Sequence, residues 1–83
     1  MRVTIHNAIK KLVDSDAREV VLPGEDGELS VWDFHQSCLY SLRAGQIKLL
    51  PAGSSNNEEI KRFPLKKGLA IIRSDMVSVL IED

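Results

Sequence analysis

The sequence predicts a small all-β domain, built as a two-sheet β-sandwich or flattened barrel. Its apolar residues come in short clusters that are rich in β-branched side chains and separated by turn formers. Within the clusters the apolar period is close to two and not to 3.6, which favours strands over helices. A chain of 83 residues has room for one modest core. We therefore expect a single β-sandwich domain over residues 1–83.

The first three expected strands flank the clearest turn signal. Residues 3–6 alternate, residues 18–22 form a strand that ends at Pro23-Gly24, and residues 28–33 alternate with Leu29 and Val31 on one face and Trp32 on the other. Between the last two strands, residues 23–27 combine one proline with two glycines and an Asp-Gly pair. Such a segment is suited to a tight reversal, so we expect a hairpin there.

The remaining strands are shorter clusters with a turn after each. The pattern predicts strands over residues 38–42, 46–50, 59–63, 68–73 and 76–81. Residues 51–58 are polar and rich in turn formers, so we expect an exposed loop there. The last two strands should form a closing hairpin through Ser74 and Asp75.

Composition excludes several classes of partner and compartment. Eleven basic and twelve acidic side chains give a net charge of -1, which does not favour nucleic acid as a partner. The apolar run at residues 69–72 is far shorter than the ~20 residues of a membrane span, so we expect no direct membrane insertion. Cys38 is the single cysteine and the N-terminus does not resemble a signal peptide, which favours a reducing compartment.

The sequence does not predict an enzyme. His6 and His35 are the only histidines, Cys38 lacks a companion at metal-ligand spacing, and no glycine-rich phosphate loop is present. His35 and Cys38 lie three residues apart, so in a strand they would point to opposite faces and could not share a proton. We expect no catalytic residue, no metal and no cofactor.

Residues 21–31 resemble the epsilon subunit of F-type ATP synthases, in which a strand enters a Gly-x-x-Gly-Glu turn and a second strand leaves it. Later family features follow in the same order. After the histidine come an apolar run that ends in a basic residue, a short turn with glycine and a strand. The last hairpin ends in an acidic pair. The residues that match are His35, Leu39, Leu42, Arg43, Gly45, Phe63, Leu65 and Gly68. The resemblance covers nearly the whole chain.

The chain departs from the family pattern at three places. The family has Pro-Gly before the histidine and Ala-Pro after it, where this sequence has residues 33–34 and 36–37. A family glycine pair is replaced by Lys67-Gly68. Family members continue into a C-terminal helical hairpin that resists ATP hydrolysis, whereas this sequence stops at Asp83. The resemblance therefore implies a coupling subunit without the inhibitory arm.

The resemblance implies a non-catalytic rotor subunit at the foot of the central stalk. It would couple ion-driven rotation of the c ring to the gamma subunit and to ATP synthesis, as a peripheral subunit at the cytoplasmic face of a bacterial inner membrane. Gly27 and Glu28 match the c-ring-binding turn, and His35, Leu39 and Leu42 match the gamma-binding segment. Because both interfaces are to other subunits, we expect a monomer in isolation.

Simpler interpretations stand beside these assignments. Glu28 alone reads as a solvated turn carboxylate, Leu39 and Leu42 could both be core residues, and Trp32 is either an exposed aromatic anchor or a core residue of the second sheet. The basic residues at 61–62 and 66–67 favour a solvated strand edge over a lipid-binding patch. For the whole chain, the alternative function is a stand-alone β-sandwich protein–protein interaction module with another partner.

Overall fold

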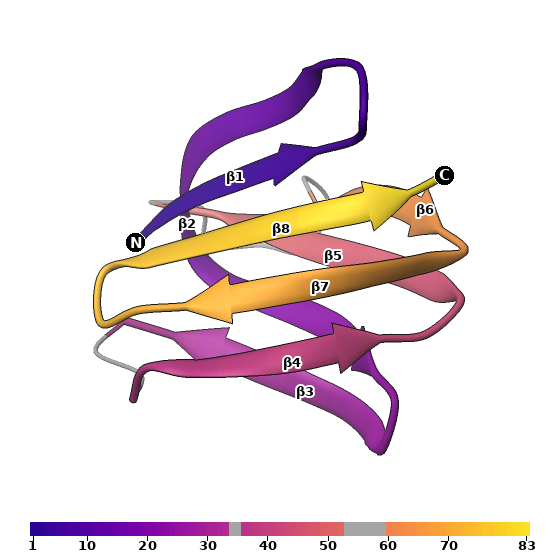
Figure 1. Ribbon diagram of the computed structural model, residues 1–83. Coiled ribbons are helices and arrows are strands. Elements are labelled where there is room, and N and C mark those ends of the chain that lie inside the picture. The colour runs from indigo at the N-terminus through magenta and orange to yellow at the C-terminus, as the bar shows by residue number, and fades with distance from the viewer. Residues whose placement is uncertain (34–35, 53–59) are drawn as a thin grey trace.

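The computed structural model describes residues 1–33, 36–52 and 60–83. All helices and strands assigned in these residues are β-strands, and no helix is among them (Figure 1). The predicted all-β class is therefore confirmed. The strands are β1 Arg2–His6, β2 Lys11–Gly24, β3 Gly27–Trp32, β4 Cys38–Leu42, β5 Gly45–Pro51, β6 Lys61–Leu65, β7 Lys67–Ile72 and β8 Met76–Glu82.

The strands form two layers that share β2. One layer holds β4, β7, β8 and β1 together with the first half of β2, and Figure 1 shows β1, β8, β7 and β4 side by side in front of the rest. The other layer holds β3, the second half of β2, β5 and β6. Among the described residues, the β1–β8 pair is the only parallel one, and the other strand pairs are antiparallel.

The length of β2 is the main difference from the sequence prediction, which placed this strand at residues 18–22. It begins at Lys11, and its first half pairs with β1. Its only apolar residues before Ala17 are Leu12 and Val13, which are adjacent, so the apolar alternation that marks a strand is weak there. An irregularity in the β2–β5 register between Ala17 and Glu19 lies where the strand passes from one layer into the other.

The core fills the space between the two layers. Alternation along β3 sends Val31 inward and its neighbours Ser30 and Trp32 outward. The fully or nearly fully buried apolar side chains are Val3, Ile5, Ala17, Val20, Leu22, Val31, Leu42, Ile47, Leu49, Leu65, Ala70, Ile72, Val77, Val79 and Ile81. Leu29 and Phe63 pack against them from the margin.

β6 extends further than the sequence indicated. The predicted strand ends at residue 63, before Pro64, but pairing with β5 continues through Pro64 to Leu65. Within the described residues β6 pairs with β5 alone, and a proline is tolerated on such an edge because no partner needs its missing N–H. Lys61 and Arg62 are exposed on the same edge strand, as the edge interpretation expects.

The start of the chain is fastened at two points. The α-amino nitrogen of Met1 lies 2.7 Å from Asp33 Oδ1 and donates a hydrogen bond to the Ala17 carbonyl at 2.9 Å. In the turn between β1 and β2, the Asn7 carboxamide oxygen accepts hydrogen bonds from the backbone N–H groups of Ile9 and Lys10.

Of the predicted loop at residues 51–58, only residues 51 and 52 belong to the described part of the chain.

Candidate partner-binding surfaces

The turn between β2 and β3 is shaped by two glycines. Gly27 has a φ of 131°, a conformation that L side chains rarely adopt. At Gly24 a Cβ atom would lie 2.7 Å from the carbonyl oxygen of Gly27, so the two backbone segments approach too closely for any side chain. The predicted reversal is therefore confirmed, and it requires glycine at both positions.

Glu28 follows this turn on the outer face of β3. Its side chain is 65% exposed, and its Oε2 lies 4.0 Å from Lys48 Nζ on β5. An exposed pair at this distance contributes little to stability. The carboxylate is therefore held near one cation but stays accessible to a partner.

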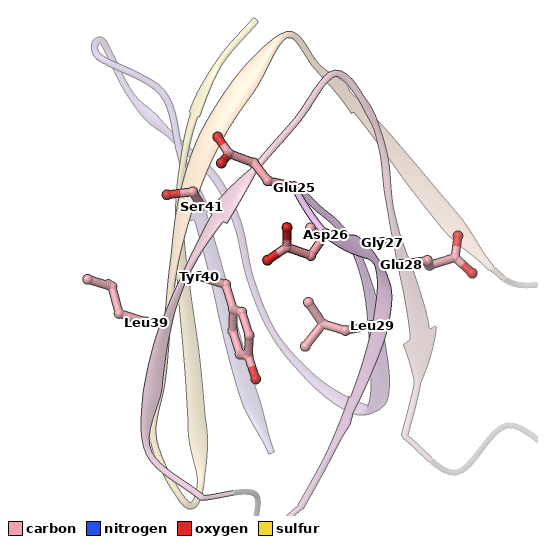
Figure 2. Close-up of a pocket in the computed structure, with 9 residues that line it drawn as sticks. Glu25, Asp26, Gly27, Glu28, Leu29, Leu39, Tyr40 and Ser41 are labelled. Atoms are coloured by element: carbon pink, nitrogen blue, oxygen red, sulfur yellow. The ribbon is translucent and has the colours of Figure 1, made fainter.

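A hollow of about 570 Å³ separates the turn from β4. Figure 2 shows the Tyr40 ring extending from β4 toward Leu29 on β3, with the Asp26 carboxylate above them, whereas Leu39 points away from the hollow. A hydrogen bond with Cys38 raises the pKa of the Tyr40 hydroxyl. The hollow thus separates two surfaces: Glu28 faces outward from β3 and Leu39 faces outward from β4.

Leu39 belongs to an apolar strip on the outer face of the β4–β7–β8–β1 layer. It is 63% exposed and lies beside Ile71 in the β4–β7 register, while Leu69 lies beside Leu80, which is 53% exposed. We call Leu39, Leu69, Ile71 and Leu80 the apolar strip. Side chains of this size on adjacent strands form a continuous patch of the kind that marks interaction sites.

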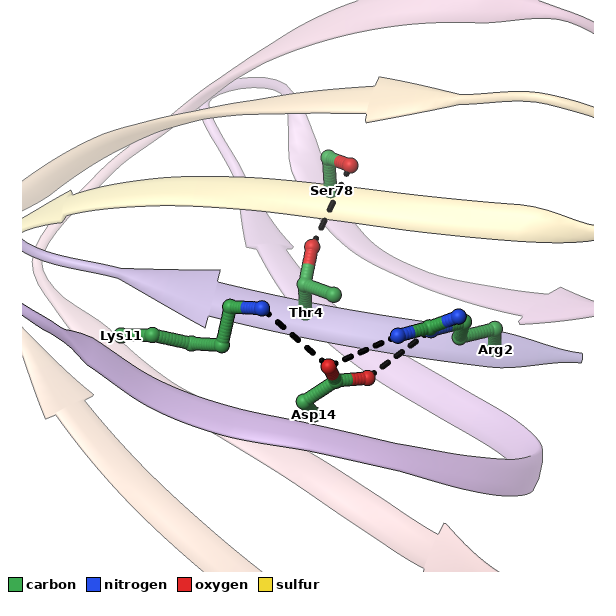
Figure 3. Close-up of polar contacts among 5 residues, drawn as sticks. All are labelled: Arg2, Thr4, Lys11, Asp14 and Ser78. Atoms are coloured by element: carbon green, nitrogen blue, oxygen red, sulfur yellow. Dashed lines mark hydrogen bonds and ion pairs between the residues drawn. The ribbon is translucent and has the colours of Figure 1, made fainter.

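A polar cluster borders the apolar strip on β1 and β2. Arg2 donates two hydrogen bonds to the Asp14 carboxylate at 2.8 Å each, and Lys11 Nζ lies 3.2 Å from the same carboxylate (Figure 3). These bonds, first from Arg2 and then from Lys11, lower the pKa of Asp14 to about 2. Next to them the Thr4 hydroxyl donates to Ser78 at 3.2 Å.

Of the other two predicted gamma-binding residues, one is buried and one lies outside the described residues. Leu42 is 1% exposed, so its side chain belongs to the core, the alternative that the sequence analysis left open. It lies three positions from Leu39 on the same strand and hence points to the other face of the sheet. His35 lies outside the described residues. Gly27, Glu28 and Leu39 are the predicted site residues that the structure places at the surface.

Trp32 is an exposed aromatic residue and not a core residue. It is 62% exposed and lies on the same face of β3 as Glu28. The alternation of β3 indicated this shared face but not that the face would be uncovered. Ile9 in the β1–β2 turn is 91% exposed. Nothing in its local sequence distinguishes it from a core residue, so the sequence does not predict this exposure.

No metal-binding cluster or membrane span is found among the residues that the structure describes. Within residues 1–33, 36–52 and 60–83, no three His, Cys, Asp or Glu side chains are grouped to hold a metal ion. No helix long and apolar enough to cross a membrane is present in that part of the chain.

The sequence matches the profile of the ATP synthase Delta/Epsilon chain β-sandwich domain over residues 1–83. It is 33% identical over 73 residues to the ATP synthase epsilon chain of Paracoccus denitrificans, covering 88% of this chain and 47% of the relative. With the chloroplastic ATP synthase epsilon chain of Phaeodactylum tricornutum it shares 30% identity over 83 residues, covering 100% of this chain and 59% of the relative. The chain thus spans about half the length of these relatives.

Solved structures show the same fold. A chain of the Tetrahymena thermophila mitochondrial ATP synthase central stalk and c ring superposes with a TM-score of 0.79 at 17% identity, covering 99% of this chain and 63% of that one. A chain of the Euglena gracilis mitochondrial ATP synthase superposes with a TM-score of 0.85 at 13% identity, covering 98% and 49%. At these identities the likeness establishes the fold alone.

Proposed function

Because the chain belongs to the family of ATP synthase delta/epsilon β-sandwich domains, we propose that it is a non-catalytic subunit of the central stalk of an F-type ATP synthase. In this role it couples ion-driven rotation of the c ring to the gamma subunit and to ATP synthesis. The observation that carries the proposal is the presence of two separate exposed surfaces, the apolar strip around Leu39 and the turn around Glu28. A coupling subunit needs one surface for each neighbour.

The apolar strip is the proposed contact for gamma. Its centre is apolar and its border on β1 and β2 is charged, which is the usual anatomy of a specific interface. Leu39 is its most exposed member and is also the family match for gamma binding. Leu42 takes no direct part because it is buried, and its role in this proposal is to fix β4 against the core.

The turn at Gly27 and Glu28 is the proposed contact for the c ring. A carboxylate that is 65% exposed can accept a charge-assisted hydrogen bond from a basic or amide group. Gly27 holds the backbone conformation of the turn that leads into Glu28 on the outer face of β3. This contact needs no cofactor and no metal.

The packing of the domain suits the transmission of torque. The two layers share β2 and enclose one core of fully buried aliphatic side chains. Close-packed interiors have low compressibility, so a force applied at the apolar strip reaches the turn with little deformation. The proposed location is peripheral, at the cytoplasmic face of a bacterial inner membrane, and membrane contact is made through the c ring.

Calorimetric titration of the chain with the gamma subunit of the same organism tests this function. We expect one-to-one binding with a Kd below about 1 μM, weakened at least about tenfold by Leu39→Ala because an exposed anchor is lost. Ser30→Ala is the matched control, since Ser30 is exposed on the outer face of the other layer. His35→Ala tests the remaining family match for gamma binding.

The alternative is a stand-alone β-sandwich interaction module with another partner. Absence of gamma binding by a chain that unfolds cooperatively would favour this alternative. Binding that Ser30→Ala weakens as much as Leu39→Ala does would instead contradict the assignment of the apolar strip.

A further inference from the structure

The outer face of the second layer carries a row of side chains on β3, of which the proposed function uses only Glu28. Glu28, Ser30 and Trp32 all point outward from β3. In the strand register Trp32 lies beside Glu19 of β2, and Glu19 lies beside Leu50 of β5. Cross-strand neighbours on one face are within contact distance of each other. Trp32, Glu19 and Leu50 therefore form one connected group.

This group lines a hollow of about 690 Å³ whose other walls are Arg18 and Asp33. The Asp33 carboxylate is ion-paired with the α-amino group of Met1 at 2.7 Å. The second carboxylate of the hollow is that of Glu19, which lies between the two apolar walls, Trp32 and Leu50. We call Trp32, Glu19 and Leu50 the tryptophan hollow.

The chemistry of the tryptophan hollow fits a basic side chain. The face of a tryptophan ring attracts a cation within ~6 Å of its centroid, and a carboxylate beside it adds a charge-assisted hydrogen bond. The methylene stem of a lysine or arginine packs against apolar walls while its charged end reaches a polar group. A purely apolar ligand would leave Glu19 without a partner in a desolvated site, which costs free energy.

The hollow is continuous with the proposed c-ring contact. Trp32 and Glu28 are four residues apart on β3, and at ~3.3 Å per residue this places them about 13 Å from each other on one face. Both ends of the row carry a carboxylate, Glu28 at one and Glu19 at the other. A partner that docks on Glu28 along this face therefore reaches the hollow.

We propose that the tryptophan hollow is a second contact for the partner that binds Glu28, and that it receives a lysine or arginine side chain of that partner. This inference rests on the proposed function, in which the partner is the c ring. It adds that the ring surface presents a lysine or arginine side chain about 13 Å from the basic or amide group that contacts Glu28. Trp32 acts as the aromatic anchor of the contact.

The single tryptophan of the chain gives a direct readout. The chain is first saturated with gamma, purified c ring in detergent is then added, and the tryptophan emission spectrum is recorded. A matched sample contains Trp32→Phe in place of the wild-type chain. Subtracting the spectrum of the matched sample removes the emission of gamma and the ring and leaves that of Trp32. We expect the emission to shift to shorter wavelength on addition of the ring, because Trp32 leaves water.

Affinity measurements on the same complexes test the chemistry. We expect Trp32→Ala and Glu19→Gln each to weaken ring binding at least about fivefold, and Trp32→Phe to weaken it less because an aromatic face remains. Lys66→Ala is the control variant, since Lys66 is exposed between β6 and β7, belongs to neither proposed contact and should not change the affinity for the ring.

The outcomes separate this inference from the proposed function. If Glu28→Gln weakens ring binding but the Trp32 emission stays unchanged and Trp32→Ala binds like wild type, the hollow is not part of the contact and the stalk function stands. If Trp32→Ala weakens binding but Glu19→Gln does not, the hollow receives an apolar group and the basic partner is wrong. If neither gamma nor the ring binds, both proposals are overturned.

Discussion

Side-chain direction decides what each residue can do in this domain. Leu39 and Leu42 are both leucines on β4, yet one is 63% exposed and the other 1%. Glu28 and Leu29 are adjacent, but Glu28 is exposed to solvent and Leu29 lines the hollow beside the Tyr40 ring (Figure 2). At this scale the functional assignments follow from alternation along a strand, and two residues, Gly27 and Asp14, lead to predictions of their own.

Gly27→Ala should destabilise the domain by about 1–3 kcal/mol, since alanine must adopt a φ near 131°. The site has open space for a Cβ atom, so the effect arises from backbone conformation and not from a clash. Urea denaturation measures it, with Asp26→Ala in the same turn as the control, expected within about 0.5 kcal/mol of wild type. Equal stability of Gly27→Ala and wild type would show that the turn tolerates another conformation.

Asp14 should titrate with a pKa of about 2, because Arg2 and Lys11 hold its charged form. The pKa is lowered in the folded state, so the contribution of this carboxylate to stability is present above its unfolded value and is lost as the pH falls toward 2. Side-chain carboxyl chemical shifts measured by NMR follow this titration. Arg2→Gln should raise the Asp14 pKa toward 3.8, and an unchanged pKa would rule out Arg2 as the main cause.

Each strand contributes one face to the core and one to a surface. β4 places Leu42 in the core and Leu39 on the apolar strip, and β3 places Val31 in the core and Trp32 on the opposite surface. β2 has a different role because it pairs in both layers and joins them. Its polar first half is held to β1 by the ladder and by the Arg2–Asp14 pair.

A matched pair of variants on β4 tests the division between core and surface. Leu42→Ala should lower the free energy of unfolding by about 2–5 kcal/mol because it leaves a cavity in the core. Leu39→Ala should change it by less than about 0.5 kcal/mol. Denaturant unfolding of the two variants compares them directly. Similar losses for both would mean that Leu39 is also covered.

The molecule as a whole presents its two proposed partner surfaces on different layers. Figure 1 shows the layer that holds β4, β7, β8 and β1 in front of β3 and β5. The apolar strip is exposed on the first layer and Glu28 on the second. A single core connects the two surfaces. This arrangement allows one partner to bind without covering the surface of the other.

Gamma and the c ring should therefore bind the chain at the same time, and each variant should affect only one of them. Leu39→Ala should weaken gamma binding and leave the c-ring contact unchanged, while Glu28→Gln should do the opposite. Sedimentation of the ternary mixture, with each variant in turn, checks both expectations. Mutually exclusive binding of gamma and the ring would contradict the two-surface arrangement.

The sequence by itself determined the all-β class, the turn between β2 and β3 and the two faces of β3, because turn chemistry and a period of two are local properties. It also carried the family resemblance. Only the tertiary structure decided that Leu42 and not Leu39 is buried, that the face bearing Trp32 is uncovered, and that the polar residues 11–16 form a strand. Alternation shows that two residues face opposite ways but not which side meets another sheet. That choice, like the pairing of Arg2 with Asp14 and of β1 with β8, depends on contacts between segments far apart in the chain.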